Sequence, residues 1–201
     1  MLGLLSIKPW SSYELTQQMD RSLGRVWPRA VSKLYEEPKK LASHGLARLA
    51  NEQNGRRTRA VYTITAKGRR ALAEWLHQPG DGPVLESEQL LKVFFADNGT
   101  TADLLATLAA AQTWARARCA ESLAVGEQYH TGGGPFPERL PELQLTSRFL
   151  TDFYLLVGEW ARWASTIVET WPDDPRQAKH DPQVIAEIVR RAAEGAKPPG
   201  G

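Results

Sequence analysis

Residues 46–65, LARLANEQNGRRTRAVYTIT, decide the fold of this chain. Here the apolar residues change from a helical spacing to the period of two that is typical of β-strands. The Asn54-Gly55 dipeptide in the middle is a strong turn signal, because both residues tolerate positive φ. We therefore predict a hairpin with strands at 46–52 and 60–65. Its tip, residues 51–59, carries Arg56, Arg57 and Arg59.

Helical patterns surround this hairpin. Ser11-Ser12-Tyr13-Glu14 is typical of a capping box, in which the first and last side chains bond to each other's backbone N–H groups. Thr65 is placed to cap the helix that follows the hairpin. The predicted helices cover residues 2–7, 12–24, 29–43 and 66–77, and Leu72, Trp75 and Leu76 of the last one face inward. Three helices, a hairpin and a helix within 80 residues predict a winged helix-turn-helix.

The rest of the chain has only helical patterns. Breaks rich in glycine and proline interrupt them at 80–83, 131–137 and 171–175, and the second break should join two antiparallel helices. We predict a mainly α protein with a small β-hairpin. An N-terminal winged helix-turn-helix domain covers 1–80, and a C-terminal all-helical dimerisation domain covers 84–171. Residues 172–201 form a tail with room for one short helix before a disordered end.

The segment 142–169 carries two adjacent apolar stripes on one predicted helix. Each repeats at 4-3-4-3-4 spacing: Phe149, Phe153, Leu156, Trp160, Trp163 and Ile167 in the first, and Leu150, Tyr154, Val157, Ala161, Ala164 and Val168 in the second. One stripe is enough to dock a helix on its own domain. The second needs another partner, so we predict a homodimer held by the helices at 87–97 and 142–170.

The composition of the chain excludes several classes of protein. The chain of 201 residues has 42 % hydrophobic and 24 % charged residues and no long apolar run, so we expect a cytoplasmic globular protein without a membrane anchor. Its single cysteine excludes an intrachain disulfide, and its four histidines are scattered, so we predict no metal and no cofactor. No nucleophile, phosphate-loop or dinucleotide motif is present, and nothing indicates an enzyme.

The net charge of +2 conceals an asymmetry along the chain. Residues 1–80 hold 14 Lys and Arg against 6 Asp and Glu, whereas residues 81–201 hold 11 against 17. A basic winged helix favours a polyanionic partner, and an acidic helical part does not. We therefore expect double-stranded DNA as the partner of the first part.

Four motifs, in order along the chain, resemble the PadR-like transcriptional regulators. They are Leu2-Gly3-Leu4-Leu5 with Ser12-Tyr13-Glu14-Leu15, Lys33-Leu34-Tyr35 with residues 39–46, residues 57–68, and residues 90–96. The resemblance covers about residues 2–170. It implies a homodimeric, usually repressing, DNA-binding protein whose C-terminal helices hold the dimer, and some members bind small aromatic effectors near that interface. The chain departs from the family pattern at Glu36, where a proline is usual, and beyond residue 172.

The candidate DNA contacts lie on the third helix, on the wing and at the start of the second helix: Arg29, Ser32, Lys33, Tyr35, Lys39, Arg56, Arg57, Arg59 and Tyr13. The first turn of the third helix should approach base edges, and Lys39 should reach phosphate or water. The wing arginines should contact phosphates, and a solvated polar turn is the alternative. Tyr13 and Tyr35 could donate to phosphate or be half-buried core residues. Pro38 removes one hydrogen bond of its helix and could bend it, and a tolerated kink near the solvent end is the alternative.

Phe153, Trp160 and Trp163 mark a candidate effector site or dimer interface. A planar aromatic effector could stack between such rings across a two-fold axis, although plain interface packing is the favoured interpretation. The sequence thus predicts a homodimeric regulator, a repressor, that binds a pseudo-palindromic operator with helix 29–43 and wing 51–59. The alternative is a winged-helix module that binds proteins or small molecules without sequence-specific DNA binding.

Overall fold

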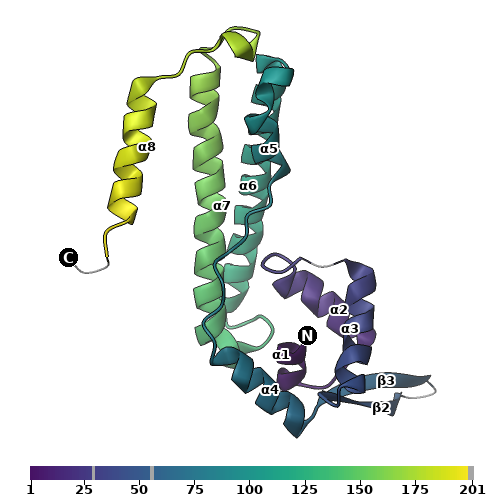
Figure 1. The fold of residues 1–201 in the computed structure, drawn as a ribbon. Coiled ribbons are helices and arrows are strands. Elements are labelled where there is room, and N and C mark those ends of the chain that lie inside the picture. The colour runs from purple at the N-terminus through teal and green to yellow at the C-terminus, as the bar shows by residue number, and fades with distance from the viewer. Residues whose placement is uncertain (29, 55–56, 199–201) are drawn as a thin grey trace. The chain divides into compact units, whose positions relative to one another are not determined.

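The structure of this protein is a computed structural model that describes residues 1–28, 30–54 and 57–198 (Figure 1). The chain divides into two compact units, Met1–Pro83 and Val84–Gly201, and each is described by itself. The first unit combines short helices with a small sheet, and the second has only helices. The predicted fold class, mainly helical with an N-terminal winged helix-turn-helix, is confirmed.

Four helices form most of the first unit: α1 (Leu2–Ile7), α2 (Ser12–Gln18), α3 (Val31–Ser43) and α4 (Ala66–Leu76). A π-helical segment, Met19–Leu23, continues α2. The predicted capping box is present, because Ser11 Oγ accepts the Glu14 N–H at 3.2 Å and a Glu14 carboxylate oxygen accepts the Ser11 N–H at 2.8 Å. Thr65 caps α4 as predicted, with its Oγ1 3.0 Å from the Gly68 nitrogen.

The sheet has three antiparallel strands in the order β1-β3-β2: β1 (Trp10–Ser11), β2 (Ala47–Asn54) and β3 (Arg57–Ile64). The β2–β3 pairing runs from Ala47 opposite Ile64 to Asn54 opposite Arg57. The predicted strand limits at 52 and 60 were therefore wrong, because the ladder extends to Asn54 and Arg57 although the alternation of apolar residues stops earlier. The strand β1 was missed, since two residues are too few to show a period.

The core of the first unit lies between the helices and the sheet, and it includes Leu5, Leu15, Leu34 and Val61. Two expectations fail here. Pro38 does not lie at a solvent end of α3, because its side chain is fully buried and the helix continues through it. Trp75 and Leu76 do not face inward, because both are 68 % exposed in the last turn of α4. Only the first turn of that helix, at Gly68, is buried against the unit.

The second unit is built on two long helices, α6 (Thr101–His130) and α7 (Leu140–Val168). They pack side by side along their length, and the predicted glycine-rich break joins them as an antiparallel pair (Figure 1). Small side chains such as Ala111, Ala115 and Ala161 are buried at the contact. Since small residues let two helices approach closely, this seam explains why the long helix α6 is rich in alanine.

Shorter elements flank the helix pair. A short helix, α5 (Glu88–Phe94), precedes α6, and α8 (Pro182–Gly195) lies in the C-terminal tail. The start of α6 is tied to the segment after α7, because the Thr101 hydroxyl donates to the Pro172 carbonyl and the Thr101 N–H donates to that of Asp173. Across the described residues, no helix is both long and apolar enough to cross a membrane.

Candidate nucleic-acid interface

The helix α3 presents a polar face whose position is set by two buried anchors. Leu34 and Pro38 are buried, which fixes one side of the helix against the core of the unit. The opposite side carries long and polar side chains, and those that the structure exposes are Ser32, Lys33, Glu36, Lys39 and Lys40. The structure thus places the predicted contacts Ser32, Lys33 and Lys39 on solvent-facing positions. Arg29 lies outside the described residues.

Hydrogen bonds join the C-terminal end of α3 to the base of the wing. Gly45 ends the helix with a φ of +70°, a left-handed conformation that glycine adopts without strain. The Thr65 hydroxyl donates to the Gly45 carbonyl at 2.7 Å, and the Lys67 ammonium donates to the His44 carbonyl at 2.9 Å. These bonds fix the orientation of α3 relative to strand β3. Sequence analysis missed them, because the partners lie about twenty residues apart.

One wing arginine is held by the second helix. Arg59 Nη1 lies 3.0 Å from Glu14 Oε1, so that Glu14 serves both the capping box and this ion pair. The backbone N–H of Ser11, followed by its hydroxyl, holds the pKa of the Glu14 carboxyl below its usual range, and Arg59 adds to the shift. The geometry follows from β1, since Ser11 pairs with Val61, two residues beyond Arg59. Because β1 was missed, this pair could not be predicted.

The remaining wing arginines are not placed at the level of side chains. Arg56 lies outside the described residues, and only the backbone of Arg57 is described, at the start of β3. The two candidate tyrosines are placed. Tyr13 is 60 % exposed, so it is not a half-buried core residue, and its hydroxyl accepts a hydrogen bond from Gln17 Nε2 at 2.7 Å. Tyr35 is 39 % exposed on α3.

The candidate effector residues of α7 have different surroundings. Trp160 packs against the buried cluster of Leu104, Leu108 and Val168, whereas Trp163 is 47 % exposed. Phe153 instead makes a T-shaped contact with the Trp114 ring from α6, with centroids 6.4 Å apart. The structure therefore does not gather these three residues into one site. It places Phe153 in a ring cluster with Trp114 and Tyr154, which sequence analysis did not single out.

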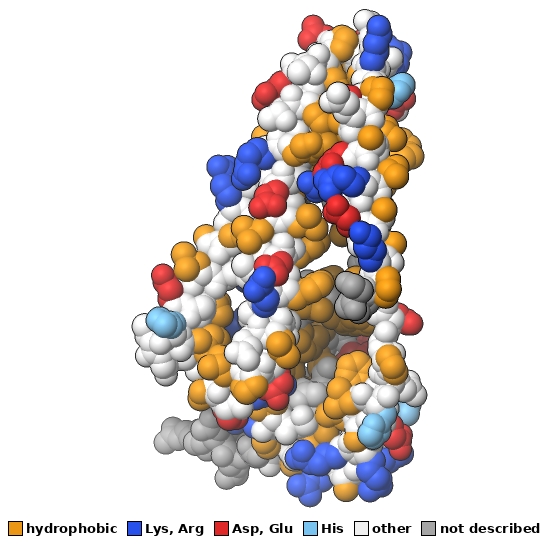
Figure 2. Space-filling model, turned by 90° about the vertical axis from the view of Figure 1, so that its left-hand side faces the viewer, with side chains coloured by type: hydrophobic (Ala, Val, Ile, Leu, Met, Phe, Trp, Pro, Cys, Tyr) orange, Lys and Arg blue, Asp and Glu red, His pale blue; other side chains and the backbone are white. Residues whose placement is uncertain are grey.

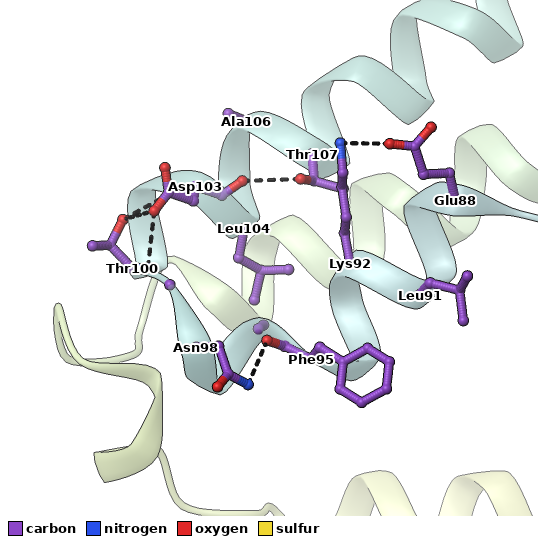
Figure 3. Close-up of a pocket in the computed structure, with 12 residues that line it drawn as sticks. Glu88, Leu91, Lys92, Phe95, Asn98, Thr100, Asp103, Leu104, Ala106 and Thr107 are labelled. Carbon is purple, nitrogen blue, oxygen red and sulfur yellow. Dashed lines mark hydrogen bonds and ion pairs between the residues drawn. The ribbon is translucent and has the colours of Figure 1, made fainter.

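An open groove of about 580 Å³, the α5–α6 groove, lies between α5 and the first turns of α6 (Figure 3). Leu91 and Phe95 on one side and Leu104 on the other give it an apolar lining. Polar contacts stand at its rims: Lys92 Nζ lies 2.9 Å from Glu88 Oε1, and the Asp103 carboxylate accepts the Thr100 N–H at 3.0 Å. The sequence predicted a helix here but could not show a concave surface.

The surface of the helical unit carries many large apolar side chains. Figure 2 shows hydrophobic side chains spread among charged ones over this unit, in the upper part of the view. The exposed apolar residues of α5, of its C-cap Phe95 and of α7 include Leu91, Phe94, Phe95, Leu145, Phe149, Leu156 and Trp163. Among the described residues, no group of three or more His, Cys, Asp or Glu side chains is placed to hold a metal ion.

A helix-turn-helix with a two-stranded wing, followed by a helical unit, defines the class of winged-helix regulators. Residues 1–74 match the profile of the transcriptional regulator PadR-like family. The winged-helix unit is thus similar to that family, which confirms the resemblance found in the sequence. The family comprises transcriptional regulators rather than enzymes.

Two curated relatives share sequence with the chain. The negative transcriptional regulator PadR of Bacillus subtilis is 34 % identical over 98 residues, which are 47 % of this chain and 53 % of that protein. The probable transcriptional regulator Rv1176c of Mycobacterium tuberculosis is 33 % identical over 70 residues, 34 % of this chain and 37 % of that protein. The matched segments thus span about half of the first relative and about a third of the second.

Solved structures share the fold over most of the chain. Bacillus subtilis PadR in complex with operator DNA has a TM-score of 0.72 at 21 % identity, covering 83 % of this chain and 96 % of that one. The same regulator in complex with p-coumaric acid has a TM-score of 0.66 at 21 % identity, covering 84 % and 95 %. The Vibrio cholerae virulence activator AphA has a TM-score of 0.56 at 25 % identity, covering 84 % and 93 %.

Proposed function

We propose that this protein is a homodimeric transcriptional repressor of the cytoplasm that binds a pseudo-palindromic DNA operator. Helix 29–43 enters the major groove, and the wing at 51–59 follows the phosphate backbone. The observation that carries the proposal is the solvent-facing side of α3, with Lys33, Lys39 and Lys40 exposed on a helix whose other side is buried. Repression is favoured over activation because a curated relative that is 34 % identical over 98 residues is a negative transcriptional regulator.

Dimerisation is supported by apolar surface that the chain itself does not cover. Phe94 is 79 % exposed, and Leu91 and Leu156 are each 60 % exposed. Large apolar side chains that stay uncovered on two helices are typical of an interaction surface, so a second copy is the partner we propose for α5 and α7. A two-fold dimer then presents two α3 helices to two half-sites. The first test is light scattering, which should give twice the mass of the chain at micromolar concentration and not the mass of one chain.

Lys33 and Lys39 should differ in their effect on sequence specificity, because only Lys33 is expected to contact bases. Lys33 lies in the first turn of α3, where a side chain can reach guanine O6 and N7, whereas Lys39 lies six residues later along the helix. Lys33→Ala should weaken operator binding by about 1–3 kcal/mol and random DNA binding by less, while Lys39→Ala should weaken both equally. Fluorescence anisotropy on the two DNAs measures this. Equal behaviour of the two variants would move specificity away from the first turn of α3.

The wing arginines should contribute to DNA affinity through their charge and not through base contacts. Changing Arg56, Arg57 and Arg59 together to Ala should weaken operator and random DNA binding alike. The slope of log K against log salt should flatten by about 0.9 for each phosphate that a subunit no longer neutralises. The matched control removes three arginines from the helical unit, Arg148, Arg190 and Arg191, and should leave the slope unchanged. If the wing variant also kept the wild-type slope, the wing would not contact DNA.

We also propose that a planar aromatic acid modulates DNA binding at the helical unit. A related regulator was solved with p-coumaric acid, and this chain exposes the Trp163 ring on α7. Titration with p-coumaric acid should quench tryptophan fluorescence and weaken operator binding, and Trp163→Ala should reduce both effects. Wild-type fluorescence and DNA affinity that are both insensitive to the acid would reject this effector class.

A further inference from the structure

Glu36 is an acidic residue on a helix face that the proposed function turns toward DNA. It lies in the second turn of α3 and is exposed. At 100° per residue it lies within about 60° of Lys33 and about 40° of Ser32 around the helix axis. It therefore shares the solvent-facing side of α3 with the residues that we expect to approach base edges, and it lies away from the buried Leu34 and Pro38.

The charge of Glu36 is not compensated within the described part of the chain. Lys40 lies four residues later, the usual spacing for a helical ion pair, but its ammonium is 3.6 Å from the carboxylate of Glu37 instead. No hydrogen bond or ion pair of the Glu36 side chain with a described residue is found. The two neighbouring glutamates thus differ, since Glu37 is half-buried and paired whereas Glu36 is exposed and available to a ligand.

An available carboxylate on such a face restricts which DNA can bind. Phosphates repel it, so Glu36 lowers the affinity for DNA in general. In the major groove, a carboxylate gains a hydrogen bond only where a base edge offers an N–H donor. Cytosine offers the N4 amino group. Adenine offers the N6 amino group beside the acceptor N7, which would repel the second carboxylate oxygen, and guanine and thymine offer acceptors there.

We propose that Glu36 is a specificity-determining residue, which accepts a hydrogen bond from the N4 amino group of a cytosine in each half-site. The assignment rests on the proposed function, because it requires α3 to lie in the major groove. Lys33 beside it supplies donors that match guanine O6 and N7. Together the two side chains select a groove edge where acceptors stand next to a cytosine donor, and Glu36 disfavours all other sites.

The test is selection of bound sequences from a randomised DNA pool by the full-length protein and three variants. The wild type should enrich cytosine at one position of each half-site. Glu36→Ala should lose that preference, and Glu36→Gln should shift it to adenine, because an amide pairs with N6 and N7 together. Both variants should bind random DNA about two- to fivefold more tightly at low salt, since a negative charge is removed.

Glu37→Gln is the matched control, because it removes the same charge from the same helix. It should also tighten random DNA binding, yet it should select the same bases as the wild type. The assignment is overturned if the wild type and both Glu36 variants select identical sites, or if Glu37→Gln changes the same base position. A wild type that enriches no sequence at all would instead overturn the proposed function itself.

Discussion

The double variant Phe94→Glu/Leu156→Glu should be a monomer that binds operator DNA about 100-fold more weakly than the wild type. In the single chain both side chains are exposed, at 79 % and 60 %, so two carboxylates there should leave the fold intact. In the proposed dimer the same positions are covered by apolar surface, and burying an unpaired charge is strongly unfavourable. The loss of affinity arises because a monomer can hold only one half-site.

Light scattering and anisotropy on the operator measure these two effects. The matched control is Gln144→Glu, which adds a charge at an exposed polar position of α7 and should leave both mass and affinity unchanged. Circular dichroism should give the same helix content for all three proteins. A double variant that remained a dimer would exclude α5 and α7 from the interface, whereas an unchanged affinity in a true monomer would reject the two-half-site mode of binding.

Gly68→Ala should destabilise the winged-helix unit by about 2–4 kcal/mol, which lowers its Tm by roughly 10–25 °C. A Cβ at this position would lie 2.1 Å from the Leu46 carbonyl oxygen and 2.9 Å from the Ile64 side chain. The oxygen belongs to the backbone, so it cannot move without displacing the start of the wing. The same shift would break the hydrogen bonds that fix α3 relative to β3, so operator binding should fall together with stability.

Calorimetry of Gly68→Ala beside Gly3→Ala checks this prediction. Gly3 lies inside helix α1 and an added Cβ meets nothing within 4 Å, so its replacement by Ala should be neutral or stabilise the unit by up to about 1 kcal/mol. Both variants change one glycine of the same unit, which isolates the effect of the close approach. A Gly68→Ala protein that melted with the wild type would mean that α4 does not pack this closely on the wing.

Features whose partners lie a few residues apart could be predicted from the sequence. The capping box of Ser11 and Glu14 and the Thr65 cap follow such local patterns, and both are present. The antiparallel pair of long helices joins more distant residues, but the short glycine-rich break between two helical patterns was enough to predict it. Of the two stripes on α7, one is buried on α6 through Tyr154, Ala161 and Val168. The other leaves Phe149, Leu156 and Trp163 exposed, which is the arrangement that led us to predict a dimer.

Features that join distant segments could not be predicted. The two-residue strand β1 has a partner about fifty residues away, and the ion pair of Glu14 with Arg59 exists only because β1 brings them together. A periodic pattern also shows which side of a helix is apolar, but it does not show how much of the helix length packs against the rest of the unit. For this reason Trp75 and Leu76 were assigned to the core, although α4 passes beyond it.

The most direct test of the central claim is selection of bound fragments from genomic DNA by the purified full-length protein, with sequencing of what is retained. A dimeric winged-helix regulator should enrich a small set of sites that share a two-fold symmetric sequence, and raising the salt concentration should release them steeply. Retained DNA without any common sequence, or no retention at low salt, would contradict the account and would favour a winged helix that binds other partners.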